Sequence, residues 1–187
     1  MRKYLLGGVA LMSLFAASPV LAEEAHVAPV TEYIDANVKP WLSDPVLIEA
    51  IKAQNAANAA LDQAGIDALD QKWRGEVEAD SHPMIANPVS AFLKAKQEAS
   101  GGTITEAFVT DAKGLNVGQS DVTSDYWQGD EDKFSKSFGA GAGALFVDAA
   151  EKDESTQKFQ AQASFTLKDE TGKPIGAVTV GVSLDDL

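Results

Sequence analysis

The sequence predicts an α+β fold, with N-terminal helices packed on a five-stranded antiparallel sheet formed by residues 104–187. Two observations lead to this prediction. Up to residue 100 the apolar residues recur at helical spacing, and after residue 104 they alternate with polar residues in runs joined by short turns. Helices and strands do not alternate along the chain, as a parallel doubly wound sheet would require.

The first 22 residues have the pattern of an export signal. Arg2 and Lys3 precede an apolar run at 4–17, and small residues come before a cleavage point after Ala22. The run is shorter than the ~20 residues of a spanning helix, so an uncleaved N-terminal anchor is only the alternative. We expect no membrane insertion once the signal is removed. The prediction is a periplasmic, soluble mature protein with a signal peptide at 1–22, a flexible start at 23–29 and one domain at 30–187.

Residues 30–100 are predicted to form the helices. A first helix follows from the apolar spacing of Tyr33, Ile34, Val38 and Trp41. Asp44-Pro45 and Asn87-Pro88 each combine an N-cap residue with proline at the first helical position, and so each should open a further helix.

The helix after Asp44 is expected to be long, with Leu69 and Trp73 in its apolar stripe and Gly65 as a point of kinking or division. Its amide and alanine side chains, including Gln54, Asn55 and Asn58, indicate a close and partly polar contact with another helix. That contact could be internal, or it could be the seam of a homodimer.

Two hairpins and one strand between them complete the sheet. The first hairpin turns at Asp111-Ala112-Lys113-Gly114, the third strand lies in the segment GALFVDA, and the second hairpin turns at Gly-Lys-Pro. Alternation gives the last two strands an apolar side, which the helices should cover: Phe159, Ala161, Ala163, Phe165, Leu167, Val178, Val180, Val182 and Leu184.

The opposite side of those strands carries small and amide side chains. A plain solvated surface is one explanation of it.

The insert SDYWQGDEDKFSKSF suggests a second explanation, in which the insert covers this polar side. Tyr126 and Trp127 are costly to expose, and the insert is long enough to fold back over the strands. An aromatic wall facing hydrogen-bonding groups would make a small-molecule site. The predicted polar wall is Gln160, Gln162, Ser164, Thr179 and Ser183, with Asp148 either at its rim or on the surface. Alternatively the two aromatic residues form a small core of the insert itself.

Composition argues against several classes of function. A net charge of −13, which loss of Arg2 and Lys3 makes more negative by two, disfavours nucleic acid and anionic lipid as partners. The absence of cysteine excludes disulfides, thiolate metal sites and a cysteine nucleophile. His26 in the flexible start and His82 before a proline offer no catalytic triad. We therefore expect neither an enzyme nor a cofactor.

An acidic cluster surrounds the start of the insert helix. Its spacing does not match a calcium-binding EF-hand loop, and acids are favourable at a helix N-terminus, so we expect a solvated charge run and no metal. The cluster consists of Asp121, Asp125, Asp130, Glu131 and Asp132.

The segments VTDAKGLNVGQSDVTSDYWQGDEDKF and KFQAQASFTLKDETGKPIGAVTVGVSL resemble the Cache family of extracytoplasmic, PAS-like sensor domains. The resemblance extends from Val30 to Leu187 and implies a ligand pocket between the sheet and the insert. Amino-acid-binding members carry an arginine shortly before the tryptophan of the insert, where this chain has Asp125. A carboxylate beside Tyr126 and Trp127 suits an amine-bearing ligand better, through ion pairing and cation–π contact.

In receptors of this family the last strand continues into a membrane helix, whereas this sequence stops at Leu187. The resemblance therefore implies a free-standing sensor domain that passes its ligand state to a membrane receptor or sensor kinase. The alternative is a periplasmic interaction or dimerisation module that binds no ligand.

Overall fold

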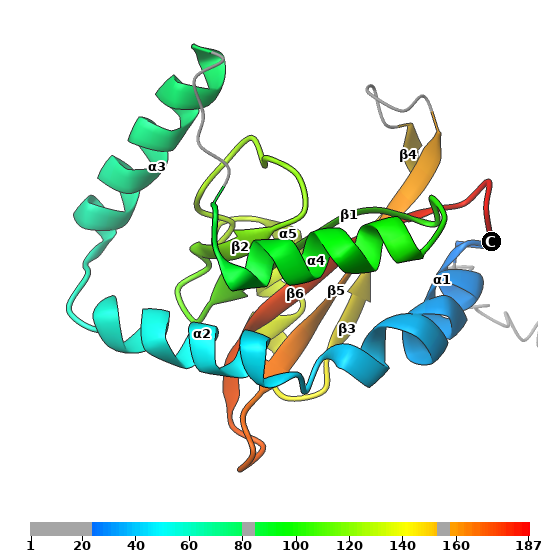
Figure 1. The fold of residues 1–187 in the computed structure, drawn as a ribbon, viewed down its shortest axis with the longest axis horizontal. Coiled ribbons are helices and arrows are strands. Elements are labelled where there is room, and N and C mark those ends of the chain that lie inside the picture. Colours follow the sequence, from blue (N-terminus) through cyan, green and yellow to red (C-terminus); the bar gives the residue numbers. More distant parts are fainter. Residues whose placement is uncertain (1–23, 80–84, 153–157) are drawn as a thin grey trace, which may run out of the picture.

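The computed structural model describes residues 24–79, 85–152 and 158–187, so the predicted signal peptide and His82 lie outside the described residues. Figure 1 shows the order of the elements, with helices first and strands after them. The principal helices are α1 (Val27–Tyr33), α2 (Pro45–Ala57), α3 (Gln63–Glu78), α4 (Pro88–Ala99) and the short α5 (Asp132–Ser135). The strands are β1 (Ile104–Asp111), β2 (Asn116–Gln119), β3 (Leu145–Val147), β4 (Glu151–Lys152), β5 (Phe159–Lys168) and β6 (Pro174–Ser183).

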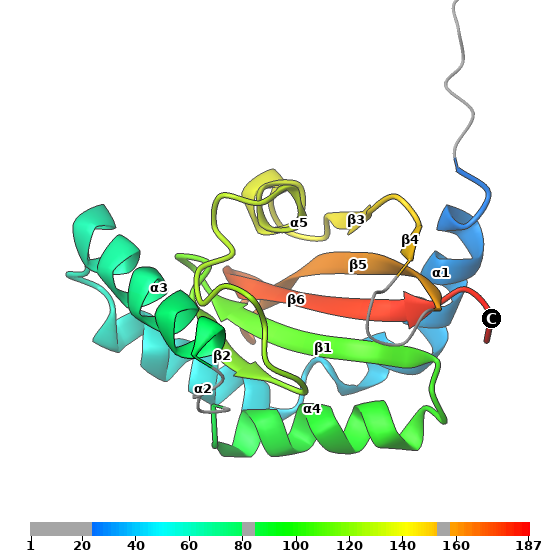
Figure 2. The ribbon, with the colours of Figure 1, turned by 90° about the horizontal axis from the view of Figure 1, so that it is seen from above.

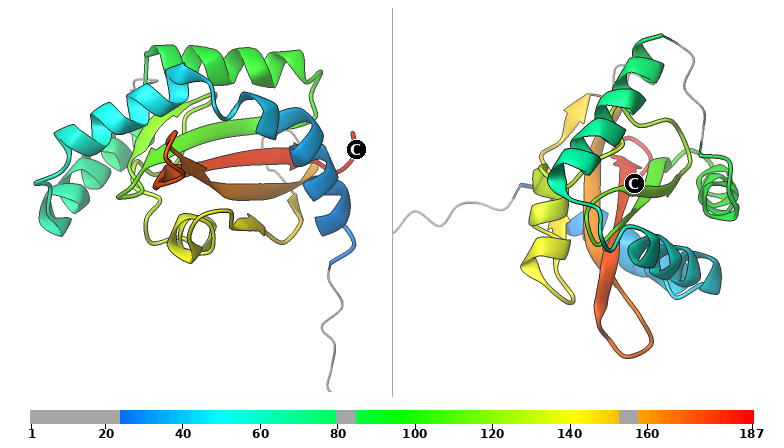
Figure 3. Two further views of the ribbon diagram at one scale, coloured as in Figure 1. Left: turned by 90° about the horizontal axis from the view of Figure 1, so that it is seen from below. Right: turned by 90° about the vertical axis from the view of Figure 1, so that its left-hand side faces the viewer.

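The elements form three layers. Figures 2 and 3 show α1, α2 and α4 on one face of the sheet and α5 on the other, while α3 stands at one end. The predicted α+β fold with helices on an antiparallel sheet is therefore confirmed.

The N-terminal helical region begins at Val27, inside the range expected to be flexible. It continues from α1 through a π-helical turn, η1 (Ile34–Val38), and a 3₁₀ turn, η2 (Lys39–Trp41), to the break before α2. Val30, Ile34 and Val38 are fully buried against the sheet. The four-residue spacing of these side chains explains why this face of the helix packs inward.

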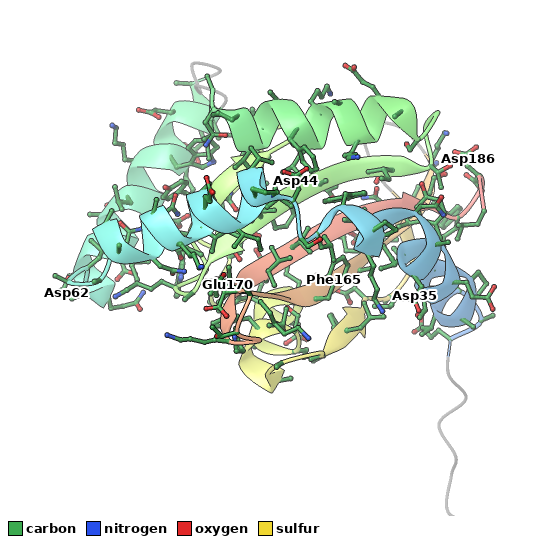
Figure 4. All side chains as sticks on the ribbon, turned by 60° about the horizontal axis from the view of Figure 1, so that its bottom comes forward. Asp35, Asp44, Asp62, Phe165, Glu170 and Asp186 are labelled. Atoms are coloured by element: carbon green, nitrogen blue, oxygen red, sulfur yellow. The ribbon has the colours of Figure 1, made fainter. Side chains whose placement is uncertain are left out.

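The long helix predicted after Asp44 is two helices. Asp44 accepts a hydrogen bond from the backbone N of Val46 at 3.0 Å and caps α2, as its sequence context predicts. A second cap, Asp62, accepts from the backbone N of Gly65 at 2.9 Å and starts α3. Figure 4 labels both caps. The division thus lies between α2 and α3, before Gly65.

The amide side chains of α2 and of its C-cap residue contact the protein's own sheet. Gln54 donates to the carboxylate of Asp111, and Asn58 donates to the same carboxylate at 2.9 Å. Asn55 donates to the carbonyl of Ile175 at 2.7 Å. The contact is therefore internal, as one of the two explanations held, but its partner is the sheet and not another helix.

The sheet has the order β2-β1-β6-β5-β3, with every neighbouring pair antiparallel. The sixth strand, β4, pairs with the start of β5 and was not predicted. It has only two residues, Glu151 and Lys152, and both are exposed, so no alternation of burial marks it in the sequence.

The apolar side of the sheet is the core predicted from alternation. Phe165 is 4 % exposed and Val178 and Val180 are fully buried beneath the helices; Figure 4 shows Phe165 on the helix-covered side. Phe159 is the exception, because it lies at the first position of β5 and is 51 % exposed. Among the described residues, no helix combines the length and apolar character needed to cross a bilayer.

Candidate functional site

The polar side of the central strands is buried. Ser164 is fully buried and Thr179 is 3 % exposed, and their hydroxyls are hydrogen-bonded to each other at 2.9 Å. Gln160 and Ser183, from the same side, are also buried, while Gln162 is half-buried and donates to Glu106 at 2.8 Å. The solvated-surface explanation of this face is therefore wrong.

The insert, residues 124–138, covers this polar face together with the residues that flank it on either side (Figure 2). The hydroxyl of Thr166 on β5 bonds to the carbonyls of Ser137 and Gly141, at 3.1 and 2.8 Å, and so fixes the insert to the strand. The Lys133 side chain is only 16 % exposed and pairs with Glu131 at 2.9 Å. Its ammonium lies 5.6 Å from the ring centre of Phe108, which pairs with Thr179 across the β1–β6 ladder. The covered face therefore has hydroxyls at its centre and a cation at its edge.

A β-bulge sends two amide side chains to the same face. Val109 pairs with Gly118 and Thr110 pairs with Asn116, which leaves one extra residue in β2. Asn116 and Gln119 are three positions apart and would point to opposite sides of a regular strand. Because of the bulge their amides contact each other, with Asn116 Nδ2 3.4 Å from Gln119 Oε1.

The buried polar atoms of this strand pair are incompletely bonded. Thr110 Oγ1, Asn116 Oδ1 and Gln119 Nε2 have no hydrogen-bond partner among the described residues. Each of the three residues is 2 % exposed or less. Buried polar groups are nearly always bonded, so these three atoms mark a functional candidate.

A segment that we call the cover loop, residues 121–128, lies over these atoms. Asn116 Nδ2 donates to the hydroxyl of Thr123 at 2.8 Å and to the carbonyl of Asp125 at 3.1 Å. The backbone N of Asn116 also donates to the carbonyl of Tyr126, at 3.0 Å. Asn116 therefore holds the inner side of the cover loop.

Helix α3 holds the outer side of the cover loop. The buried Asp70 accepts from the backbone N of Tyr126 at 2.9 Å and from that of Trp127 at 3.0 Å. The indole of Trp73 donates to the carbonyl of Thr123 at 2.8 Å, and its ring centre lies 5.6 Å from that of Tyr126. The loop thus connects the buried amides of β2 to α3.

The structure divides the predicted site residues into two groups. Gln160, Gln162, Ser164 and Thr179 lie on the polar side of β5 and β6, as described above. Tyr126 packs on α3, and the Trp127 indole donates to the carbonyl of Lys113 in the β1–β2 turn at 2.8 Å. The predicted arrangement, in which the two aromatic side chains oppose the hydroxyls, is therefore not what the structure has.

Two acidic residues of the predicted site also have partners within the protein. Asp125 forms an ion pair with Arg74 Nε at 2.9 Å, so the charge that suggested an amine-bearing ligand is already matched. Asp148 follows β3, and its carboxylate accepts from the backbone N of Ala149 at 2.8 Å. Its carbonyl lies 2.8 Å from His26 Nε2, which ties the N-terminal segment to this strand end.

A separate hollow of about 610 Å³ lies outside the cover loop, between α3 and Trp127. Its other lining residues are Asp67, Asp70, Gln71, Arg74, Gly75, Glu78 and Asp130. Its lining thus combines acidic side chains with the indole of Trp127 and the guanidinium of Arg74.

The acidic cluster of the insert consists largely of separate ion pairs. Lys94 pairs with Asp121 at 2.9 Å, and Lys136 pairs with Asp132 at 2.7 Å one helical turn away. Over the part of the chain that the structure describes, no three acidic or histidine side chains come together as metal ligands would.

Sequence reasoning missed Thr110, Asn116, Gln119 and Lys133. One signal was present for the amides: a glycine inside a short strand, Gly118, is typical of a bulge. At that glycine an added Cβ would lie 2.5 Å from Cγ1 of Val89. The absence of a side chain at Gly118 therefore allows α4 to approach β2 closely.

The Tyr126 hydroxyl gives a first testable prediction. Burial raises its pKa above the ordinary value of about 10, and the negative charge of Asp111 adds to the effect. The folded state therefore resists ionisation, and the resulting stabilisation is present below pH 10 and lost as the pH rises through the raised pKa. The free energy of unfolding, measured with urea, should fall between pH 8 and pH 11 by less in Tyr126→Phe than in the unchanged protein. Equal losses would contradict this account.

Comparisons with known proteins find similarity in structure alone, since no family model and no curated protein sequence matches the chain. The sensor domain of the V. cholerae histidine kinase DctB aligns with a TM-score of 0.49 and 13 % identity, over 86 % of this chain and 51 % of that one. The E. coli DcuS sensor domain aligns with a TM-score of 0.49 and 15 % identity, over 84 % of this chain and 91 % of that one.

The ligand-binding domain of the Pseudomonas fluorescens chemoreceptor CtaA, solved with L-serine, has a TM-score of 0.39 and 16 % identity, over 86 % of this chain and 59 % of that one. This chain therefore spans about half of the DctB domain and most of the DcuS domain. These are structural similarities to bacterial sensor domains, the class to which the sequence resemblance points, and they concern fold alone.

Proposed function

We propose that this chain is a sensor domain that binds a small polar molecule between the sheet and the insert. The supporting observation is the composition of the covered face. Ser164 and Thr179 occupy central strand positions that are as buried as the apolar core on the other side. Stability alone favours apolar residues there, because a buried hydroxyl pair adds little to stability compared with apolar groups of the same shape. A polar ligand would explain the hydroxyls.

The central test replaces the two hydroxyls without changing side-chain shape. Ser164→Ala combined with Thr179→Val should leave the free energy of unfolding unchanged or slightly raised, because both hydrogen-bonding partners are removed together. Ligand binding should be lost. Ser135→Ala, which removes an exposed hydroxyl of α5, is the control and should change neither property.

The ligand itself can be sought by thermal shift with amines, amino acids and organic acids. A ligand at 100 times its Kd adds roughly 2.7 kcal/mol of stability, a shift of several degrees for a domain of this size. Loss of binding in the double variant supports the proposal. Binding that survives it but disappears in Trp127→Ala would instead place the ligand in the acidic hollow beside α3.

We place this sensor domain in the periplasm, on the signal pattern at 1–22, and we infer that a membrane receptor or sensor kinase receives its ligand state. The alternative is an interaction or dimerisation module without a ligand. In the described part of the chain, the exposed large apolar side chains are Leu69, Phe159 and Leu187, which belong to α3, the start of β5 and the chain end. A screen in which no compound shifts the melting temperature would favour that alternative.

A further inference from the structure

Three of the unpartnered buried atoms on β1 and β2, namely Thr110 Oγ1, Asn116 Oδ1 and Gln119 Nε2, form a pattern of donors and acceptors. Asn116 Oδ1 can only accept a hydrogen bond and Gln119 Nε2 can only donate one, while the Thr110 hydroxyl can do either. Asn116 and Gln119 contact each other through their other amide atoms, at 3.4 Å, and Thr110 pairs with Asn116 across the ladder. The three residues are therefore neighbours on the insert-facing side of the sheet.

We propose that this pattern binds a primary carboxamide or urea group of the ligand, an inference that rests on the proposed function of the covered face. Such a group supplies an N–H for Asn116 Oδ1 and a carbonyl oxygen for Gln119 Nε2. A carboxylate has no hydrogen to donate and would face the lone pairs of Asn116. An ammonium group has no acceptor for Gln119. A site built from buried polar groups rejects analogues that leave those groups unpaired.

The charges around the pattern are matched within the protein, which favours a neutral ligand group. Lys133, over the ring of Phe108, pairs with Glu131 at 2.9 Å. Asp111 is fully buried and adjoins Thr110 in the chain, but its carboxylate is already occupied. One oxygen accepts from the backbone N of Lys113 at 2.8 Å and of Leu115 at 3.1 Å, and the other accepts from Gln54 and Asn58. Its charge is therefore held toward α2 and the turn, away from the unpartnered atoms.

Access to the three atoms requires movement of the cover loop, because each has less than 1 Å² of exposed surface. The closed arrangement leaves polar groups without partners, which destabilises it. A ligand that bonds to these groups removes that destabilisation. Asn116 makes three hydrogen bonds to the inner side of the loop, so a residue that holds the loop also contacts the proposed ligand group.

The test uses compounds matched in shape. Propionamide, propionate and n-propylamine, and separately nicotinamide and nicotinate, are titrated against the full chain and followed by ligand-observed NMR, which detects weak binding. We expect the two amides to bind and their acid and amine counterparts to bind at least tenfold more weakly. Gln119→Met, which keeps the length of the side chain but removes its amide, should weaken amide binding at least tenfold without loss of stability. Gln63→Met, at an exposed glutamine of α3 outside the acidic hollow, is the matched control and should bind as the unchanged protein does.

Failure of this inference can be distinguished from failure of the proposed function. If propionate, nicotinate or propylamine binds as well as the amides, or if Gln119→Met binds amides normally, the carboxamide assignment is wrong while the covered face remains a ligand site. If no compound of the wider screen binds, both are wrong. If Gln119→Met loses stability and no amide binds, the three atoms bind buried water that belongs to the structural core. The carboxamide assignment is then overturned as well.

Discussion

Asp70→Ala is expected to detach α3 from the cover loop and to lower the free energy of unfolding by roughly 2–4 kcal/mol. The carboxylate of Asp70 accepts two backbone N–H groups of the loop and pairs with Arg74 at 2.7 Å. Hydrogen bonds to a charged group are stronger than neutral ones, and the alanine variant leaves both donors without a partner. Arg74 is half exposed and can be solvated, so most of the loss comes from the two backbone groups.

Hydrogen exchange followed by mass spectrometry can localise this effect. In Asp70→Ala the amides of α3 and of the cover loop should lose protection while those of β5 and β6 keep it, because α3 stands at one end of the sheet (Figure 2). Asp70→Asn retains one acceptor oxygen and should lose about half as much stability. Asp67→Ala, one turn earlier on the exposed side of α3, is the matched control and should stay within about 0.5 kcal/mol of the unchanged protein. An Asp70→Ala variant that behaves like Asp67→Ala would show that the loop is held by other contacts.

The sequence was sufficient to predict those features of the fold that depend on a local pattern of residues. Proline after Asp44 and Asn87 marked two helix starts correctly, and period-two alternation separated the buried apolar residues of β5 and β6 from the polar ones. These features depend on neighbours in the chain, so the printed sequence contains the information needed to predict them.

The prediction of buried residues was wrong where a helix restarts, because the face that points inward then changes. Leu69 was assigned to the apolar stripe of one long helix, but α3 starts afresh at Asp62 and turns Ile66, Asp70 and Trp73 inward, so Leu69 is 40 % exposed. A polar residue such as Asp70 in the buried stripe has no periodicity signal, since its partners are backbone groups 56 and 57 residues away.

The candidate site was predictable only in part, because some of its contacts join residues that no sequence pattern links. Alternation identified Ser164 and Thr179, and the length of the insert indicated what covers them. The amides of β2 became part of the covered face through the bulge, and Trp127 was drawn to the β1–β2 turn by the carbonyl of Lys113. Neither contact can be read from the spacing of residue types.

Gly114→Ala should be as damaging as the loss of Asp70, although Gly114 has no side chain to lose. Gly114 has φ +83°, and an added Cβ would lie 2.6 Å from Cα and 2.7 Å from N of Gly129. Both are backbone atoms, which cannot move aside as a flexible side chain could. The segment that follows the cover loop would have to leave the turn, and with it the hydrogen bond from Gln128 N to the Gly114 carbonyl at 2.8 Å. We expect a loss of about 3 kcal/mol or more, from the left-handed conformation and the displacement together.

Gly172→Ala separates these two contributions. Gly172 lies in the β5–β6 turn with φ +84°, almost the same backbone conformation, and an added Cβ there would meet no atom within 4 Å. Its substitution should therefore cost only the conformational term, about 1–2 kcal/mol. Urea unfolding of the two variants gives the difference, which measures how tightly the 127–129 segment packs on the turn. Equal losses would mean that this segment yields freely, and the cover loop would then have no firm attachment on this side of the buried amides. A larger loss for Gly114→Ala, together with weakened ligand binding that Gly172→Ala does not share, would connect the fixed position of the loop to the site beneath it.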